Sequence, residues 1–113
     1  MQRIGIVGNG FVGNAIANGF KKTEKVEVLV YDIDESKCTH KYKDVVACDY
    51  VFVCLPTPMT HMEGGVCNLS FVEKFFKDIE KSDSIFIIKS TVPIGTTRNL
   101  CEQYPNLKIV HNP

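Results

Sequence analysis

The sequence predicts a single α/β domain, built on a doubly wound parallel sheet of about five strands. Two observations point to this class. Short apolar runs alternate with longer amphipathic stretches along all 113 residues. The runs "IGIV", "VFVC" and "IFII" also lack polar alternation, which indicates strands buried on both faces. Strands of this kind, alternating with helices, form parallel sheets with helices on both sides.

The first half of the chain contains two strands and one clear helix. Residues 3–8 form a β-branched run that ends in glycine and predicts the first strand. Apolar side chains then recur at helical spacing over residues 11–20, which predicts a helix. A second strand is expected over residues 26–32. Residues 33–48 are mixed and polar, so only a short helix or a turn is expected there.

The middle of the chain predicts a third strand and a second helix. The strand covers residues 49–56 and stops at its final proline. After a glycine-containing loop, residues 68–81 carry apolar side chains at helical spacing. Ser70 and Glu73 have the spacing of a capping box at the start of this helix.

The last third completes the sheet, with a strand over 84–90, a helix beginning near Gly95 and a strand over 107–113. Right-handed crossovers and the long link after the second strand give the strand order 2-1-3-4-5. The direction of winding reverses between strands 1 and 3. A ligand is expected at this switch point, outside the carboxyl ends of the strands.

Composition argues against several functional classes. Thirteen basic and thirteen acidic residues cancel without long runs of one sign, so neither nucleic acid nor a membrane surface is the expected partner. The apolar runs are far shorter than the roughly 20 residues of a membrane span, and no signal peptide is recognisable. The five cysteines include no C-x-x-C pair, and the histidines lack metal-ligand spacing, so no metal is expected. A reducing cytoplasmic compartment fits best.

A glycine motif predicts a Rossmann-like dinucleotide site. Gly8, Gly10 and Gly13 have G-x-G-x-x-G spacing between a strand and a helix, and Asp32 ends the next strand nineteen residues later. Gly8 makes the turn, Gly10 lets a pyrophosphate approach the backbone, and Gly13 lets the helix pack closely. Asp32 would accept hydrogen bonds from ribose hydroxyls and repel a 2′-phosphate, which favours NAD over NADP. The alternative is a flexible turn beside a solvated aspartate.

Further motifs carry a resemblance to a known family. "GIVGNGFVG", "VYDIDESK", "VFVCLPTP", "IIKSTVPIGTT" and the closing "HNP" occur in order along almost the whole chain. Together they resemble the N-terminal NAD-binding domain of the UDP-glucose/GDP-mannose dehydrogenase family. Members oxidise the C6 alcohol of a nucleotide sugar to a carboxylate with two NAD molecules in succession, as in the conversion of UDP-glucose to UDP-glucuronate. The aldehyde intermediate is held on a cysteine. The resemblance implies that residues 1–113 form the NAD-binding domain of such an enzyme.

The resemblance also implies residues for the phosphate and ribose side of the cofactor. The positions that match the pyrophosphate turn are Gly8, Asn9, Gly10, Phe11, Val12 and Gly13, with the backbone N–H groups of Asn9, Phe11 and Val12 facing phosphate. Asp32 matches the ribose-binding acid. Lys37 matches a basic position that borders the adenosine ribose, although an exposed helix lysine is the alternative.

A second set of positions matches the nicotinamide side. Thr57 and Pro58 match the pair beside the nicotinamide ribose, and Leu55 is expected to touch the cofactor or to belong to the core. Thr91 matches a threonine near the reacting C6, as an auxiliary catalytic group, with an ordinary helix-entry hydroxyl as the alternative. Lys89 is expected to make no direct contact with the cofactor or the substrate.

The chain also departs from the family pattern. The nucleophilic cysteine, the substrate-binding lysine and the assisting glutamates belong to family segments beyond Pro113, so no sugar oxidation is expected from this chain alone. No cysteine matches the nucleophile, and Cys54 and Cys101 fit core positions. A strand and a helix are missing between Asp32 and Asp49, where the family builds the adenine-side wall.

Two functional alternatives remain open from the sequence. One is an NAD-dependent dehydrogenase domain of the 3-hydroxyacid type, which shares the glycine turn. The other is a stand-alone dinucleotide-binding module without chemistry. Apolar surface left by a missing neighbouring domain also makes homo-oligomers an expectation.

Overall fold

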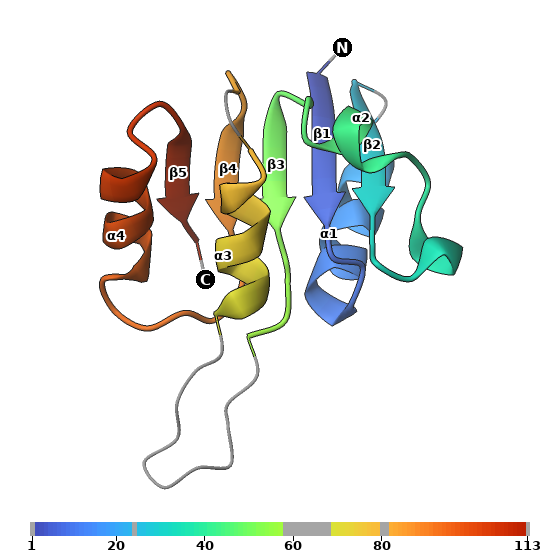
Figure 1. The fold of residues 1–113 in the computed structure, drawn as a ribbon. Coiled ribbons are helices and arrows are strands. Elements are labelled where there is room, and N and C mark those ends of the chain that lie inside the picture. Colours follow the sequence, from blue (N-terminus) through green and yellow to red (C-terminus); the bar gives the residue numbers. More distant parts are fainter. Residues whose placement is uncertain (1, 24, 58–68, 80–81, 113) are drawn as a thin grey trace, which may run out of the picture.

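The computed structural model describes residues 2–23, 25–57, 69–79 and 82–112. Its centre is a parallel five-stranded sheet in the order β2-β1-β3-β4-β5, which confirms the predicted order (Figure 1). The strands are β1 (Gln2–Val7), β2 (Val26–Tyr31), β3 (Tyr50–Val53), β4 (Ile85–Ile88) and β5 (Lys108–His111).

Short helices connect the strands. They are α1 (Phe11–Lys21), the 3-10 helix η1 (Glu35–Lys37), α2 (Tyr42–Val45), α3 (Ser70–Lys77) and α4 (Thr96–Gln103). The helix expected over 68–81 is therefore observed as α3, and residues 68, 80 and 81 lie outside the described part. Leu69, and not Ser70, is the N-cap of α3 and makes no side-chain cap, so the predicted capping box is wrong.

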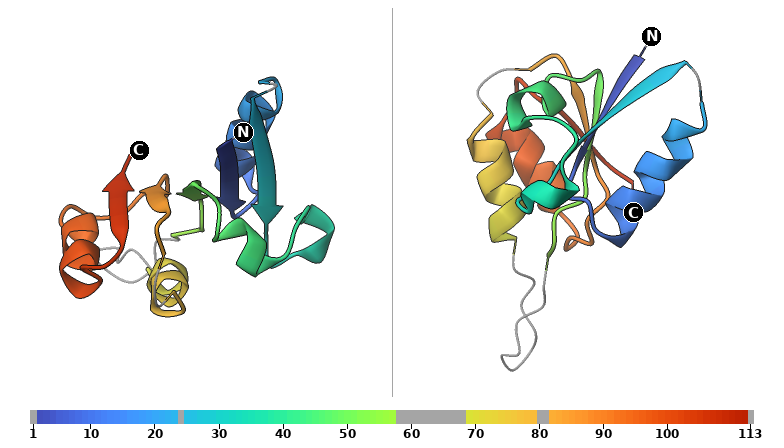
Figure 2. Two further views of the ribbon diagram at one scale, coloured as in Figure 1. Left: turned by 90° about the horizontal axis from the view of Figure 1, so that it is seen from above. Right: turned by 90° about the vertical axis from the view of Figure 1, so that its right-hand side faces the viewer.

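The helices form layers on both faces of the sheet (Figure 2). On one face, Ile16, Ala17 and Phe20 of α1 pack against a small cluster that includes Ile4 and Ile6 of β1. The other face carries the larger cluster, which joins α2, α3 and α4 to the sheet. Its largest fully buried side chains include Phe76 and Phe86, Ile88 and Val51. Each such side chain contributes about 1.5–3 kcal/mol to folding.

The prediction that the third and fourth strands are buried on both faces holds for only one face. Burial alternates along both strands: Val53 and Ile88 are fully buried, whereas Phe52 and Ile87 are only half-buried. The half-buried residues lie on the face that carries α1. Among the described helices, α1 is the one on this face. It lies mainly over β1 and β2, and its Phe20 ring reaches Phe52 of β3.

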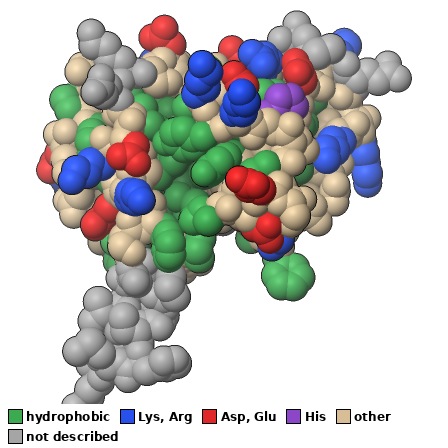
Figure 3. Space-filling view, turned by 45° about the vertical axis from the view of Figure 1, so that its right-hand side comes forward, with side chains coloured by type: hydrophobic (Ala, Val, Ile, Leu, Met, Phe, Trp, Pro, Cys, Tyr) green, Lys and Arg blue, Asp and Glu red, His purple; other side chains and the backbone are tan. Residues whose placement is uncertain are grey.

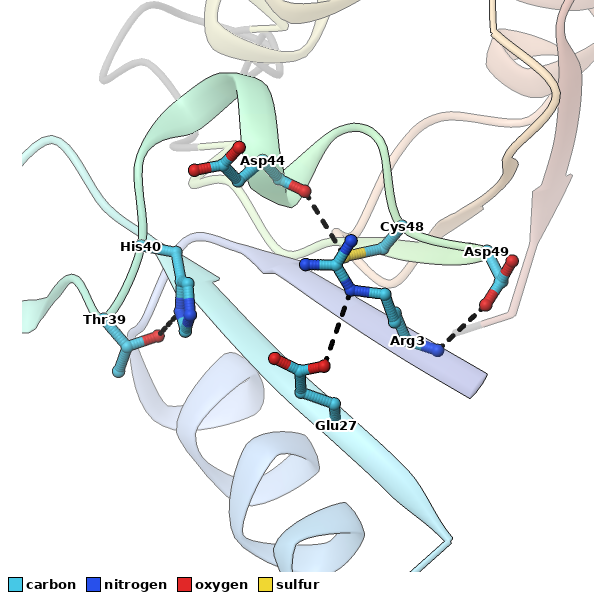
Figure 4. A network of polar contacts seen from close by, with 7 residues as sticks. All are labelled: Arg3, Glu27, Thr39, His40, Asp44, Cys48 and Asp49. Atoms are coloured by element: carbon cyan, nitrogen blue, oxygen red, sulfur yellow. Dashed lines mark hydrogen bonds and ion pairs between the residues drawn. The ribbon is translucent and has the colours of Figure 1, made fainter. Parts of the chain in front are cut away.

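Polar contacts tie the strands together at the amino end of the sheet (Figure 4). The Arg3 N–H donates to Asp49 Oδ2 at 2.9 Å, and its guanidinium lies 3.6 Å from Glu27, its register partner on β2. The Cys48 thiol donates to the Asp44 carbonyl at 3.5 Å. Because the Arg3–Glu27 ion pair is half-exposed, it contributes at most about 1 kcal/mol to stability.

In the described part of the chain, no helix has the length and apolar composition that crossing a membrane requires.

Candidate functional site

A cavity of about 540 Å³ opens at the carboxyl ends of β1 to β4, across the switch point between β1 and β3. The segments that follow these four strands line it together with Phe71 of α3. The predicted site residues among its lining are Gly8, Gly10, Phe11, Val12, Asp32, Lys37, Leu55, Thr57 and Thr91. Asn9 and Gly13 do not line it, and Pro58 lies outside the described residues. The fold thus brings most of the predicted positions to one place.

Each glycine of the turn has a different structural environment. Gly8 has φ +96°, and a Cβ there would lie 2.6 Å from the Cys54 carbonyl oxygen, so only glycine fits. A Cβ on Gly13 would overlap the Gly8 carbonyl oxygen, which supports its predicted role in close helix packing. A Cβ on Gly10 would meet no atom within 4 Å. The space in front of Gly10 is therefore open for a ligand to approach the backbone.

The start of α1 favours an anion. The first hydrogen bond within the helix runs from the Asn14 N–H to the Gly10 carbonyl at 2.9 Å, so the N–H groups of Phe11 and Val12 precede it. Both residues line the cavity, and both are exposed. The positive end of the helix dipole adds to these donors. The residues present therefore fit a pyrophosphate at this end of the cavity.

Backbone donors hold the Asp32 carboxylate in place. Its Oδ2 accepts from the Asn9 N–H at 2.7 Å, and its Oδ1 accepts from the Asp34 N–H at 2.9 Å. The Asn9 N–H, which the sequence assigned to phosphate, is therefore engaged by Asp32. The Asn9 side-chain amide donates to the Lys37 carbonyl at 3.0 Å. Each carboxylate oxygen has a second acceptor position, so Asp32 can still receive hydrogen bonds from a ribose.

Hydrogen bonds within residues 32–38 fix the conformation of the loop that follows Asp32. Asp34 caps η1, and its Oδ1 accepts from the Ser36 N–H at 3.0 Å and from the Ser36 hydroxyl at 2.7 Å. These hydrogen bonds lower the pKa of Asp34. The Cys38 thiol donates to the Asp32 carbonyl at 2.9 Å. Lys37, at the end of η1, lines the cavity beside Asp32.

Hydroxyl groups join the ends of β3 and β4 on the opposite side of the cavity. The Thr57 hydroxyl donates to the Thr91 carbonyl at 2.6 Å, which brings these two predicted residues together. The buried Ser90 hydroxyl donates to the Leu55 carbonyl at 2.6 Å. This side of the cavity is therefore a fixed wall, and Thr91 lies exposed on it.

Several lining residues differ from the sequence-based expectations. Lys89, expected to make no direct contact with the cofactor or the substrate, lines the cavity, and its Nζ donates to Asn112 Oδ1 at 3.4 Å. Cys54, expected in the core, also lines the cavity, and burial raises its pKa to about 11. Ile33 and Phe71 were missed. Ile33 could have been inferred because it directly follows the acid, whereas Phe71 reaches the cavity only through the packing of α3.

Other chemical groups lie away from this site. Cys101 is half-buried on α4, and its thiol donates to the Ile109 carbonyl at 3.4 Å, which fits the expected core position. His111 is exposed on β5 and does not line the cavity. A second cavity of about 580 Å³ lies at the amino end of the sheet. Because ligands of open α/β sheets bind at the carboxyl ends, the first cavity is the candidate site.

Comparison with known proteins identifies the domain. The NAD-binding-domain model of the UDP-glucose/GDP-mannose dehydrogenase family matches residues 37–113. The chain is 31% identical over 143 positions to UDP-glucose 6-dehydrogenase of Campylobacter jejuni, with 99% of this chain and 36% of that protein covered. It is also 31% identical over 148 positions to the uncharacterized protein MJ1054 of Methanocaldococcus jannaschii, covering 99% of this chain and 16% of that protein. Both alignments are longer than the 113 residues of this chain, so within the aligned region each relative has residues that this chain lacks.

Solved structures show the same fold. UDP-D-ManNAc dehydrogenase of Pyrococcus horikoshii superposes with a TM-score of 0.79 at 20% identity, over 96% of this chain and 35% of that one. The UDP-N-acetyl-mannosamine dehydrogenase Cap5O of Staphylococcus aureus gives 0.73 at 20% identity, over 96% and 36%. The chain thus spans little more than a third of these structures. The family match covers more than half of the chain, so this chain belongs to the UDP-glucose/GDP-mannose dehydrogenase family, as its NAD-binding domain.

Proposed function

We propose that the chain is the NAD-binding part of a nucleotide-sugar 6-dehydrogenase that oxidises a UDP-sugar of the UDP-glucose type. The observation that carries the proposal is the cavity at the switch point. It combines the anion-favouring start of α1 with a carboxylate fixed by two backbone N–H groups. The names of the relatives, UDP-glucose 6-dehydrogenase and UDP-N-acetyl-mannosamine dehydrogenase, support the substrate class.

The lining residues take distinct roles in this proposal. The N–H groups of Phe11 and Val12 bind the pyrophosphate, and Asp32 accepts hydrogen bonds from the adenosine ribose, with Lys37 beside it. The negative charge of Asp32 disfavours a 2′-phosphate, which selects NAD over NADP. Bound NAD supplies the hydride acceptor.

The residues on the opposite side of the cavity, at the ends of β3 and β4, also take roles in this proposal. Leu55 and Thr57 lie toward the nicotinamide ribose, and the Thr91 hydroxyl helps to orient the sugar alcohol. Pro58 keeps the role that the resemblance implies for it, beside the nicotinamide ribose. Asn9 and Gly13 act indirectly in this proposal, because one holds Asp32 and the other seats α1 against the turn.

The chemistry of sugar oxidation is assigned to segments that this chain does not include. The chain spans 36% of the Campylobacter relative. Cys54 is an unsuitable nucleophile because burial raises the pKa of its thiol to about 11. The proposal therefore gives residues 1–113 cofactor binding without turnover, in the cytoplasm. The half-exposed apolar side chains on β3, β4 and β5 make self-association a further prediction.

The test mixes the 113-residue chain with NAD and either UDP-glucose or UDP-N-acetyl-mannosamine, and follows NADH formation. A parallel calorimetric titration measures NADH binding. We expect NADH to bind and no NADH to form. Turnover by this chain would contradict the assignment of the chemistry to other segments. Sequencing the gene past codon 113 distinguishes a dehydrogenase from a stand-alone module, which a stop codon there would favour.

A further inference from the structure

The strand β2 lies at the edge of the sheet, and its end leads directly into the candidate site. The Gly8 N–H donates to the Tyr31 carbonyl at 2.8 Å, so the backbone of Tyr31 faces β1. Because the backbone groups of successive residues in a strand point to opposite sides, those of Val30 and Asp32 point to the outer edge. No described strand pairs with β2 on this outer side. These N–H and carbonyl groups therefore need other partners.

All four of these backbone groups are bonded by one short segment that follows η1. The Val30 N–H donates to Thr39 Oγ1 at 2.9 Å, and the Val30 carbonyl accepts from the N–H groups of Thr39 and His40 at 2.9 and 3.2 Å. The Asp32 N–H donates to Cys38 Sγ at 3.1 Å, and the thiol donates back to the Asp32 carbonyl at 2.9 Å. The Thr39 hydroxyl also lies 2.8 Å from His40 Nδ1, which helps to hold it in place (Figure 4). We call Cys38, Thr39 and His40 the edge clamp.

We propose that the edge clamp takes the place of a neighbouring strand at the end of β2, and that Cys38 and Thr39 thereby position Asp32 for the adenosine ribose. This inference rests on the proposed dinucleotide site. The strand expected from the family pattern between Asp32 and Asp49 is not among the strands of the structure. A strand paired with β2 would bond the same N–H and carbonyl groups that the edge clamp bonds.

The edge clamp acts on the site through Asp32 and not by contact with a ligand. None of its three residues lines the cavity at the carboxyl ends of β1 to β4, whereas Asp32 does. The Cys38 thiol holds the main chain of Asp32 at both its N–H and its carbonyl. The carboxylate is held separately, by the N–H groups of Asn9 and Asp34. An acid fixed at its main chain and its side chain loses little freedom when a ribose binds, which favours binding.

The segment that carries the edge clamp has little apolar burial of its own. Residues 34–37, 39 and 40 are exposed, and Cys38 is half-buried. Figure 3 shows charged and other polar side chains on this side of the molecule, beside a hollow in which hydrophobic side chains gather. The conformation of the segment therefore depends on its hydrogen bonds. Removing one of them should loosen Asp32 and leave the core folded.

The test compares variants of the 113-residue chain that remove or keep each clamp group. Cys38→Ala removes the thiol, whereas Cys38→Ser keeps a group that both donates and accepts. Thr39→Val removes the hydroxyl, and Thr39→Ser keeps it. Cys101→Ala is the matched control, because the half-buried Cys101 thiol also donates to a carbonyl but does not line the cavity. Circular dichroism checks that each variant is folded, and calorimetry measures NADH and NADPH affinity.

We expect Cys38→Ala and Thr39→Val each to weaken NADH about three- to ten-fold, as for one lost hydrogen bond. NADPH affinity should stay unchanged, because its 2′-phosphate gains nothing from Asp32. The two serine variants should regain most of the NADH affinity, and Cys101→Ala should change neither cofactor. In an Asp32→Ala background, Cys38→Ala should cause no further loss.

Three results would overturn the inference and leave the proposed function intact. They are equal losses for NADH and NADPH, an undiminished effect of Cys38→Ala in the Asp32→Ala background, and serine variants that bind NADH no better than Cys38→Ala and Thr39→Val. Each would show that the edge clamp supports the fold alone and does not act through Asp32.

Amide hydrogen exchange, followed by NMR, tests the edge clamp without any ligand. The Asp32 N–H in Cys38→Ala, and the Val30 N–H in Thr39→Val, should exchange about ten-fold faster than in Cys101→Ala. Exchange rates equal to those of the control would overturn the inference. Failure of the unmodified chain to bind NADH would instead refute the proposed function, and the exchange rates would still decide whether the edge clamp pairs with β2.

Discussion

Replacing Gly13 by alanine tests how closely α1 packs on the glycine turn. The added Cβ would overlap the Gly8 carbonyl oxygen, and it would lie 3.0 Å from the carbonyl carbon and 3.2 Å from Ile6 Cγ2. The nearest of these atoms are backbone, so they cannot rotate away, and α1 must shift. Overpacking of this kind costs about 1–3 kcal/mol. Alanine returns about 1 kcal/mol of helix propensity. We therefore expect Gly13→Ala to lower the free energy of unfolding by up to about 2 kcal/mol.

Gly19→Ala is the matched control in the same helix. A Cβ on Gly19 would meet no atom within 4 Å, so only the gain in helix propensity applies. This variant should be more stable by up to about 1 kcal/mol. Urea unfolding followed by circular dichroism measures both changes. If Gly13→Ala proves as stable as Gly19→Ala, the close packing of α1 on the turn is wrong.

Three further predictions concern groups around the site and the core. Burial raises the pKa of Cys54 to about 11, so its alkylation, followed by mass spectrometry, should keep accelerating from pH 9 to 11; a plateau near pH 9 would contradict this. The folded state binds the thiol proton of Cys54 more tightly than the unfolded state does. The contribution of Cys54 to the free energy of unfolding is therefore fully present below pH 9, and it should decline between pH 9 and 11. Ser84→Ala removes a buried hydroxyl that donates to the Cys48 carbonyl, and should cost about 1–3 kcal/mol in urea unfolding; an unchanged midpoint would show that this bond contributes nothing. Thr57→Val removes the donor to the Thr91 carbonyl and should weaken NADH binding several-fold in calorimetry; equal binding by both proteins would argue against a fixed wall on the nicotinamide side.

The fold was largely predictable from the sequence because its strongest signals are local. Runs such as Ile4–Val7 and Phe86–Ile88 indicate buried strands, and positive φ at Gly8 follows from the turn that the motif requires. The boundary of α3 was less predictable. Ser70 and Glu73 have capping-box spacing, but the chain enters the helix one residue earlier, with Leu69 at the N-cap.

The strand order was predicted, but individual contacts of helices and loops with distant segments could not be. A Cβ on Gly5 would overlap the Val45 carbonyl oxygen, so this strand glycine lets α2 lie directly on β1. Neither residue signals this contact in sequence. Similarly, Lys89 and Phe71 reach the cavity at the carboxyl ends of β1 to β4 through strand register and helix packing. The use of the Asn9 N–H by Asp32 is also invisible in the motif, because it depends on the relative position of two loops.

The central claim is that Asp32 holds the adenosine ribose and excludes a 2′-phosphate. Its most direct test compares NADH and NADPH affinity in Asp32→Ala and in Asp83→Ala, which removes the same charge from an exposed position at the amino end of the sheet. Losing charged hydrogen bonds to the ribose should weaken NADH about ten- to a hundred-fold in Asp32→Ala, while NADPH affinity holds or rises. Asp83→Ala should change neither. NADH affinity that is unchanged in Asp32→Ala, or an equal fall for NADH and NADPH, would contradict the claim.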